Sequence, residues 1–176
     1  VLCIILPWDN VDEEETVSPR DWSGRTLGRF MLSFGPISSL FDIVTFLFLY
    51  YFLCPMLCGG ATYLNLTDPA LRLQYVSLFQ TGWFLESMWT QVLILHFLRT
   101  RRLPFVQSRP SAPVICITLT GIVAFTAITF TGGALLFGLT KLPFGYFVFL
   151  LTVALLYMLL TTVAKYFYQK KYHELI

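Results

Sequence analysis

Two carboxylates interrupt long apolar stretches of this sequence, and their side chains are the ones best suited to chemistry. Asp42 lies within the stretch 30–54, and Glu86 lies within the stretch 78–98. Each stretch is long enough to cross a bilayer as a helix. A charged side chain at the bilayer centre costs roughly 2.5–3.5 kcal/mol on insertion scales, so such acids usually mark ion or proton pathways. We therefore predict that both acids handle a cation or a proton. The alternative is that they are protonated structural carboxyls.

Small and polar side chains accompany both acids at helical spacing. Positions three, four and seven apart share one face of a helix. The residues that follow this pattern are Gly35, Ser38, Ser39 and Thr45 around Asp42, and Gly82 and Thr90 around Glu86, with Ser87 and Gln91 on an adjoining strip. We predict that their hydroxyl and amide groups support the two acids.

The two acids are expected at similar depth in the membrane. Asp42 is eleven residues past Met31, and Glu86 is twelve residues before Leu98. At 1.5 Å per residue these separations correspond to roughly 16 Å and 18 Å. No Lys or Arg lies within the predicted spans. Three arrangements therefore remain open for the acids: protonation, a bound cation, or a basic partner from a helix outside this chain.

The composition requires a membrane environment for the elements that carry these acids. The chain is 56% hydrophobic and 12% charged, with a mean hydropathy of +0.69, whereas soluble domains carry about 25% charged residues. We predict an all-α integral membrane protein with a four-helix transmembrane bundle. Residues 1–6 should end a preceding helix, residues 7–29 form an acidic cytoplasmic loop, and residues 30–176 form the bundle and a cytoplasmic tail; the spans are 30–54, 78–98, 114–139 and 144–164.

Basic residues concentrate on one side of this predicted topology. Ten of the twelve Lys and Arg residues precede the first span, lie between the second and third, or follow the fourth; only Arg72 and Lys141 fall on the other side. Cytoplasmic loops carry an excess of Lys and Arg, so both termini are expected in the cytoplasm.

Other residues give weaker signals. Gly121 and Ala124 in the third span are small enough for helix backbones to approach closely, so we expect a packing face there. His96 is interpreted as an interfacial residue. Cys54 and Cys58 are spaced to allow a bridge, although a chance spacing is the simpler interpretation. No nucleotide loop, nucleophile–base pair, zinc motif or nucleic-acid patch is present in the sequence.

Several motifs together resemble the carboxy-terminal membrane region of magnesium-translocating P-type ATPases. The resemblance covers nearly the whole chain, and the motifs are specific together but weak singly. They are Pro7-Trp8-Asp9, Gly28-Arg29-Phe30-Met31, Gly35-Pro36 through Ser38-Ser39 to Phe41-Asp42-Ile43, Phe79-Gln80-Thr81-Gly82-Trp83-Phe84, Glu86-Ser87, Gln91, His96-Phe97-Leu98-Arg99-Thr100 and Pro104-Phe105-Val106-Gln107-Ser108.

The resemblance implies that the four spans are the last four of ten helices. The parent pump would move Mg²⁺ across the plasma (inner) membrane, driven by ATP through an aspartyl-phosphate. This chain lacks the phosphorylation and nucleotide-binding domains, so ATP belongs to the parent alone and enzymatic activity of this chain stays open. Its partners would be the lipid bilayer and the remaining helices and cytoplasmic domains of the pump, with no nucleic acid.

By the resemblance, Glu86 is a stronger candidate for ion contact than Asp42, because some related calcium pumps use an acid on the eighth helix. Both remain candidate Mg²⁺ ligands, since this ion prefers oxygen ligands and keeps several waters. Two other functions stay open. The chain could be a non-enzymatic four-helix scaffold or partner subunit, or a small proton- or cation-coupled carrier.

Overall fold

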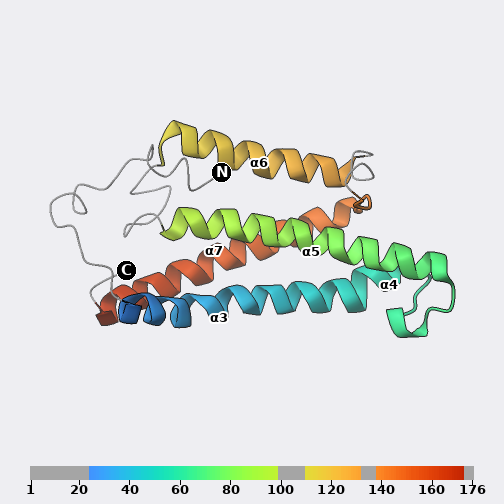
Figure 1. Cartoon of the computed structure of the whole chain (residues 1–176), viewed down its shortest axis with the longest axis horizontal. Helices are drawn as coiled ribbons and strands as arrows, with labels where there is room; N and C mark the ends of the chain where they lie inside the picture. Colours follow the sequence, from blue (N-terminus) through green and yellow to red (C-terminus); the bar gives the residue numbers. More distant parts are fainter. Residues whose placement is uncertain (1–23, 99–109, 132–137, 173–176) are drawn as a thin grey trace.

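Four long helices make up most of the structure. The computed structural model describes residues 24–98, 110–131 and 138–172, and within these ranges it is helical with no strand (Figure 1). The long helices are α3 (Gly24–Phe48), α5 (Pro69–Leu98), α6 (Ala112–Phe130) and α7 (Phe144–Tyr172); the short ones are η2 (Leu49–Leu53), α4 (Cys54–Leu57) and η3 (Tyr63–Asn65).

Length and hydropathy identify three stretches of the described residues as able to cross a membrane: Gly28–Leu57, Ala112–Phe130 and Phe144–Lys171. Helix α5 has 30 residues, about 45 Å at 1.5 Å per residue, but its polar side chains keep it outside this group. The predicted all-α membrane bundle is therefore confirmed for the described residues. The crossing by α5 and the place of these helices among ten stay predictions.

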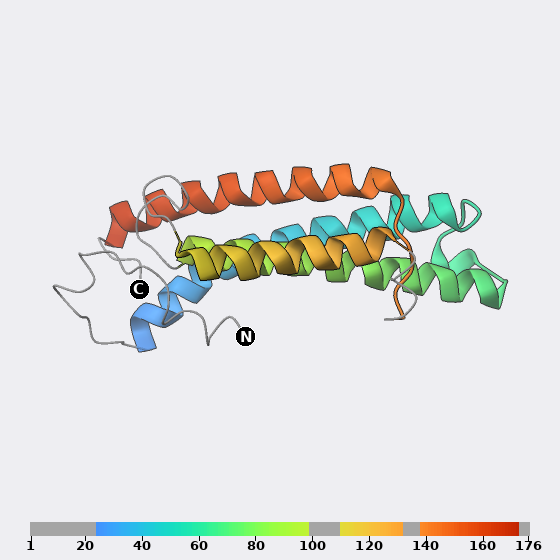
Figure 2. The same cartoon turned by 90° about the horizontal axis from the view of Figure 1, so that it is seen from above.

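Helix α5 is the centre of the bundle. It packs against α3, α6 and α7, while α7 also packs along α3. Figures 1 and 2 show α3 and α5 lying side by side in opposite directions, as expected for consecutive spans. Helix α6 packs mainly on α5, so most of its surface faces outward. This arrangement places the predicted polar faces of α3 and α5 near α7.

Helix α3 changes its hydrogen-bonding pattern towards its end. It continues into the π-helical turn η2 and then into α4. Pro55 in α4 has no N–H to donate to the preceding turn, which favours a widened turn before it. The chain then reverses at Gly59 and Gly60, whose positive φ angles suit glycine. Part of the stretch between the first two predicted spans is helical, because α5 begins at Pro69.

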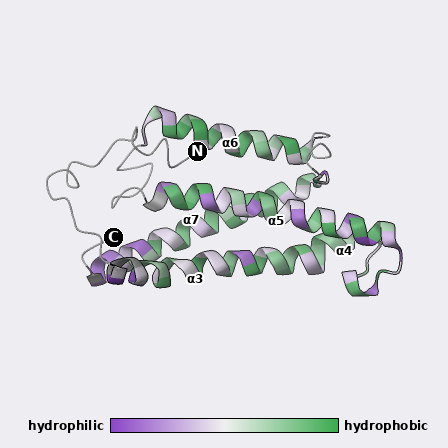
Figure 3. Ribbon diagram, viewed as in Figure 1, coloured by the Kyte–Doolittle hydropathy of each residue, from purple (hydrophilic) through white to green (hydrophobic). Residues whose placement is uncertain are grey.

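The interior contains three groups of buried apolar side chains. The largest joins η2, α4, α5 and the start of α7, and includes Leu49, Leu85 and Tyr146. A smaller group links Phe41 to Tyr157, and another links Phe34 to the end of α7. Many large apolar residues are exposed in the isolated chain, which suits contact with lipid. Figure 3 shows that apolar residues extend along all four long helices.

The predicted packing face on the third span is not a close contact in this structure. A Cβ added at Gly121 would meet nothing within 4 Å, and Ala124 is exposed. Small residues favour close approach only where another helix faces them, and α6 turns this face away from the other described helices. The helix also ends at Phe130, before the predicted limit at residue 139.

Candidate polar site at the crossing of α3, α5 and α7

Glu86 lies in the interior of the bundle. Its side chain is fully buried, and neither carboxylate oxygen has a hydrogen-bond partner. Buried polar groups are nearly always paired, because an unpaired one costs free energy. A carboxyl in this state requires a proton, a bound cation or a hydrogen-bond donor from outside this chain.

Thr45 on α3 supplies a second unpartnered oxygen. Its side chain is fully buried, and its hydroxyl has no hydrogen-bond partner. Several other threonines in these helices bond back to a carbonyl one turn earlier, as Thr81 does to Ser77 and Thr118 to Val114. This back-bonding is the usual local outlet for a helical hydroxyl, so its absence at Thr45 leaves an oxygen available inside the bundle.

Asp42 lies one turn before Thr45 on the same helix but is only half-buried. Its carboxyl is close enough to that of Glu86 for their charges to interact. Two carboxylates in a poorly solvated site repel each other unless a proton or a cation separates them. The structure thus brings together the two acids that the sequence singled out, with Glu86 the more deeply enclosed.

Helix α7 contributes two tyrosines that the sequence analysis did not include. Tyr146 is fully buried and donates a hydrogen bond from its hydroxyl to the carbonyl oxygen of Gly82, at 2.7 Å. Tyr157 packs edge-to-face on Phe41 and lies close enough to both acids for electrostatic interaction. Their spacing of eleven residues, three helical turns, places both on one face of α7, but it does not indicate which acid or carbonyl that face meets.

The predicted supporting residues separate into two groups. Thr90 is buried, with its hydroxyl bonded to the carbonyl of Glu86 at 3.1 Å. Ser38 and Ser87 are half-buried, whereas Ser39 and Gln91 are exposed. The side of α3 that carries Ser38, Asp42 and Thr45 therefore turns towards the bundle, and the edge of the predicted stripe at Ser39 turns away from it.

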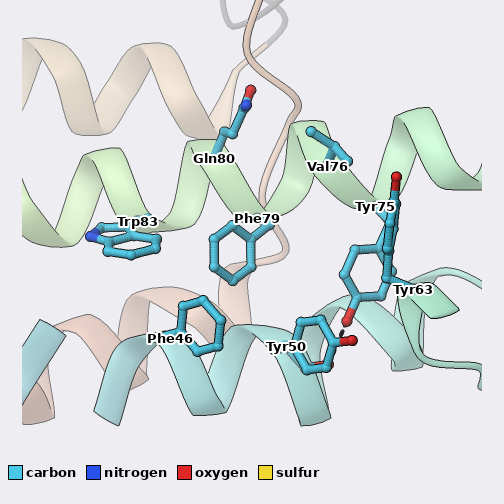
Figure 4. Close-up of a pocket in the computed structure, with 8 residues that line it drawn as sticks. All are labelled: Phe46, Tyr50, Tyr63, Tyr75, Val76, Phe79, Gln80 and Trp83. Carbon is cyan, nitrogen blue, oxygen red and sulfur yellow. Dashed lines mark hydrogen bonds between the residues drawn. The ribbon is translucent and has the colours of Figure 1, made fainter. Parts of the chain in front are cut away.

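An aromatic pocket lies between α5 and the end of α3 with η2 (Figure 4). It has a volume of about 430 Å³ and is lined by Phe46, Tyr50, Tyr63, Tyr75, Val76, Phe79, Gln80 and Trp83. No carboxylate is among these residues, and the lining is almost entirely apolar. The pocket is therefore not the cation site itself.

Two further predictions can be compared with the structure. His96 is buried, and its Nε2 lies 3.1 Å from the Thr118 hydroxyl, so it joins α5 to α6; its position at the membrane interface stays a prediction. Cys54 and Cys58 are both buried free thiols. Burial raises the pKa of the Cys58 thiol, which keeps it in its unreactive form.

No group of three or more His, Cys, Asp or Glu side chains gathers within the ranges 24–98, 110–131 and 138–172. A cation held by Glu86 and Asp42 would therefore need hydroxyl or carbonyl oxygens, water, or ligands from elsewhere. Mg²⁺ tolerates such a set, because it is commonly bound by one or two carboxylates and keeps several waters.

Comparison with known proteins establishes the family. The family described as "Cation transporting ATPase, C-terminus" matches residues 1–167. The chain belongs to this family. Over 169 residues, or 96% of the chain, it is 39% identical to "Magnesium-transporting ATPase, P-type 1" of Salmonella typhimurium and 37% identical to the protein of that name from Escherichia coli K12.

As a cation-transporting ATPase C-terminal region, the chain spans only 17% of the length of these relatives. The resemblance to the carboxy-terminal membrane region of magnesium P-type ATPases is confirmed. The roles of Glu86, Asp42 and the residues around them remain predictions, now with a defined geometry.

Proposed function

We propose that this chain is the C-terminal membrane part of an ATP-driven pump for Mg²⁺, and that it partly lines the ion path at the crossing of α3, α5 and α7. The observation that carries the proposal is the fully buried Glu86 carboxyl with two unpartnered oxygens. The names of the relatives support Mg²⁺ as the transported ion.

Within this proposal, Glu86 contacts the ion directly, and Asp42 contributes charge from a more exposed position. The unpartnered Thr45 hydroxyl adds a neutral oxygen on the facing helix. Charged groups inside a membrane are tolerated where they face an ion path or one another. ATP is handled by the parent pump, and the remaining helices of that pump complete the ligand set.

The test uses the full-length pump carrying Glu86→Gln or Asp42→Asn. Mg²⁺ binding is measured by titration calorimetry without nucleotide, and ATPase activity is measured against free Mg²⁺ at fixed MgATP. We expect Glu86→Gln to weaken Mg²⁺ binding at least about tenfold, the lower end of what changes around a metal ligand cost. The weakening should be smaller for Asp42→Asn, because that carboxyl is partly solvated.

Asp68→Asn is a matched control, because it removes a carboxylate from the start of the same helix. Asp68 is exposed and accepts a hydrogen bond from the Ala70 N–H at 2.9 Å, as an N-terminal cap. This variant should keep its Mg²⁺ affinity and most of its thermal stability, because Asn caps a helix about as well as Asp. Wild-type affinity in both Glu86→Gln and Asp42→Asn would contradict the proposal and leave the acids with a structural role.

A further inference from the structure

The helical turn that carries Glu86 is held at both ends by hydroxyl groups. At its start, the Tyr146 hydroxyl donates to the carbonyl of Gly82 at 2.7 Å, across from α7. At its end, the Thr90 hydroxyl donates to the carbonyl of Glu86. In an α-helix the Gly82 carbonyl also accepts the backbone N–H of Glu86, four residues later. Tyr146 therefore bonds to the same oxygen that fixes the backbone of Glu86.

Side chains from two other helical elements approach Gly82 closely. A Cβ on Gly82 would lie 2.6 Å from Leu49 Cδ2 on η2, the continuation of α3, and 3.4 Å from the ring of Tyr146 on α7. Gly82, Leu49 and Tyr146 are all buried, the last two completely. Three helices thus meet at one glycine, one turn away from the acid. A tightly packed position of this kind transmits a displacement instead of absorbing it.

The backbone around Glu86 is hydrogen-bonded to neighbouring groups, whereas its carboxyl is not. The backbone turn is tied to α7, while both carboxyl oxygens have no partner. This combination is what a ligand group needs if its direction is fixed before the ion arrives. Supporting hydrogen bonds that orient a ligand are costly to remove in metal sites, typically 10- to 100-fold in affinity.

We propose that Tyr146 is a positioning residue for cation binding, which sets the orientation of Glu86 through the carbonyl of Gly82. This inference rests on the proposed function, because it acts through the contact between Glu86 and the ion. Tyr146 itself does not touch the ion. The Tyr146 hydroxyl makes the bond to the Gly82 carbonyl, and the ring packs in the core. Tyr146→Phe removes the hydroxyl and keeps the ring.

The chain offers a matched control in Tyr75. Its ring is also buried, and its hydroxyl also donates across helices to a backbone carbonyl, that of Tyr50 (Figure 4). Tyr75 lies eleven residues before Glu86, which is roughly 16 Å along α5 at 1.5 Å per residue. Tyr75→Phe therefore removes an equivalent interhelical bond far from the acid.

The experiment compares Tyr146→Phe, Tyr75→Phe, Glu86→Gln and the double variant Tyr146→Phe/Glu86→Gln in the full-length pump. Mg²⁺ affinity is measured without nucleotide, and hydrogen exchange is followed in peptides that cover residues 82–90. We expect Tyr146→Phe to weaken Mg²⁺ binding about tenfold and to increase exchange in this segment. Tyr75→Phe should leave both unchanged even if it lowers the melting temperature equally.

The double variant decides whether the effect passes through Glu86. We expect Tyr146→Phe to change Mg²⁺ affinity little once Glu86 is replaced by Gln. Wild-type affinity in Tyr146→Phe, or an undiminished effect in the double variant, would overturn the positioning role while leaving the proposed function intact. Wild-type affinity in Glu86→Gln would overturn both the ion contact of Glu86 and the inference built on it.

Discussion

Replacing Thr45 should affect stability and Mg²⁺ binding in opposite directions. Its buried hydroxyl has no partner, so Thr45→Val removes an unsatisfied group and keeps the shape of the side chain. Such a replacement is nearly neutral or stabilising, because an unpaired buried hydroxyl costs about 1–3 kcal/mol. We expect the Thr45→Val pump to melt at the same or a higher temperature and to bind Mg²⁺ more weakly.

Thr81 provides the comparison for this prediction. Its hydroxyl donates a hydrogen bond to the Ser77 carbonyl and accepts one from the N–H of Thr140, so it is satisfied both as a donor and as an acceptor. Thr81→Val should lower the melting temperature, since it leaves the Thr140 N–H unpaired, and should keep the Mg²⁺ affinity. Unchanged Mg²⁺ affinity in Thr45→Val would remove this hydroxyl from the ion path.

At the residue scale, the acids could be predicted from the sequence and the tyrosines could not. Helical rise alone gave Asp42 and Glu86 similar depths on antiparallel neighbours, and the structure brings their carboxyls within electrostatic range. Tyr146 bonds to a backbone carbonyl, and every residue has one. Sequence therefore carries no mark of this partner. Tyr157 lies in a span of almost entirely apolar residues, where the sequence indicates packing and no polar contact.

At the scale of helices, the crossing of α3 and α5 depends on the absence of a side chain at Gly82. An added Cβ would lie 2.6 Å from Leu49 Cδ2 and 3.2 Å from Leu49 Cδ1. Overpacking a tight contact typically costs about 1–3 kcal/mol. We expect Gly82→Ala to lower the melting temperature of the solubilised pump, as measured by thermal unfolding.

A compensating change tests the geometry of this crossing directly. Leu49→Ala opens the space that the added methyl group of Gly82→Ala needs, so the Gly82→Ala/Leu49→Ala pair should lose less stability than the two single changes added together. Gly121→Ala on α6 is the control, since a Cβ there meets nothing within 4 Å. Simple additivity of Gly82→Ala and Leu49→Ala would show that these residues do not contact each other in the membrane.

The attachment of α6 shows why helix order is easier to predict than helix packing. The sequence suggested that Gly121 and Ala124 pack, but polar pairs hold α6 on α5 instead. His96 lies against Thr118, and the Trp89 ring N–H donates to the Thr126 hydroxyl at 3.0 Å. Interhelical bonds of this kind average about 0.6 kcal/mol in membranes. Small residues and residues with a hydroxyl group can both lie between packed helices. The composition of α6 therefore does not indicate which of its faces contacts α5.

At the scale of the whole molecule, charge is arranged along the bundle axis. Arg25 and Arg29 lie at the start of α3, and Lys170 and Lys171 lie at the end of α7; Figures 1 and 2 show both helix ends at the same end of the bundle. The opposite end carries Arg72 and Lys141 within the described residues. This asymmetry is the physical basis for expecting the α3 start and the α7 end in the cytoplasm.

Accessibility of single cysteines tests this orientation in intact cells. Asn65 and Lys170 are exposed at opposite ends of the bundle, so Asn65→Cys and Lys170→Cys are introduced one at a time into a pump whose own cysteines are replaced. We expect a membrane-impermeant maleimide to label Asn65→Cys in intact cells and Lys170→Cys only after permeabilisation. The reverse labelling would place the basic end outside. The positive charges of this chain would then not set its topology, and the depth of Glu86 would have to be counted from the opposite face of the membrane.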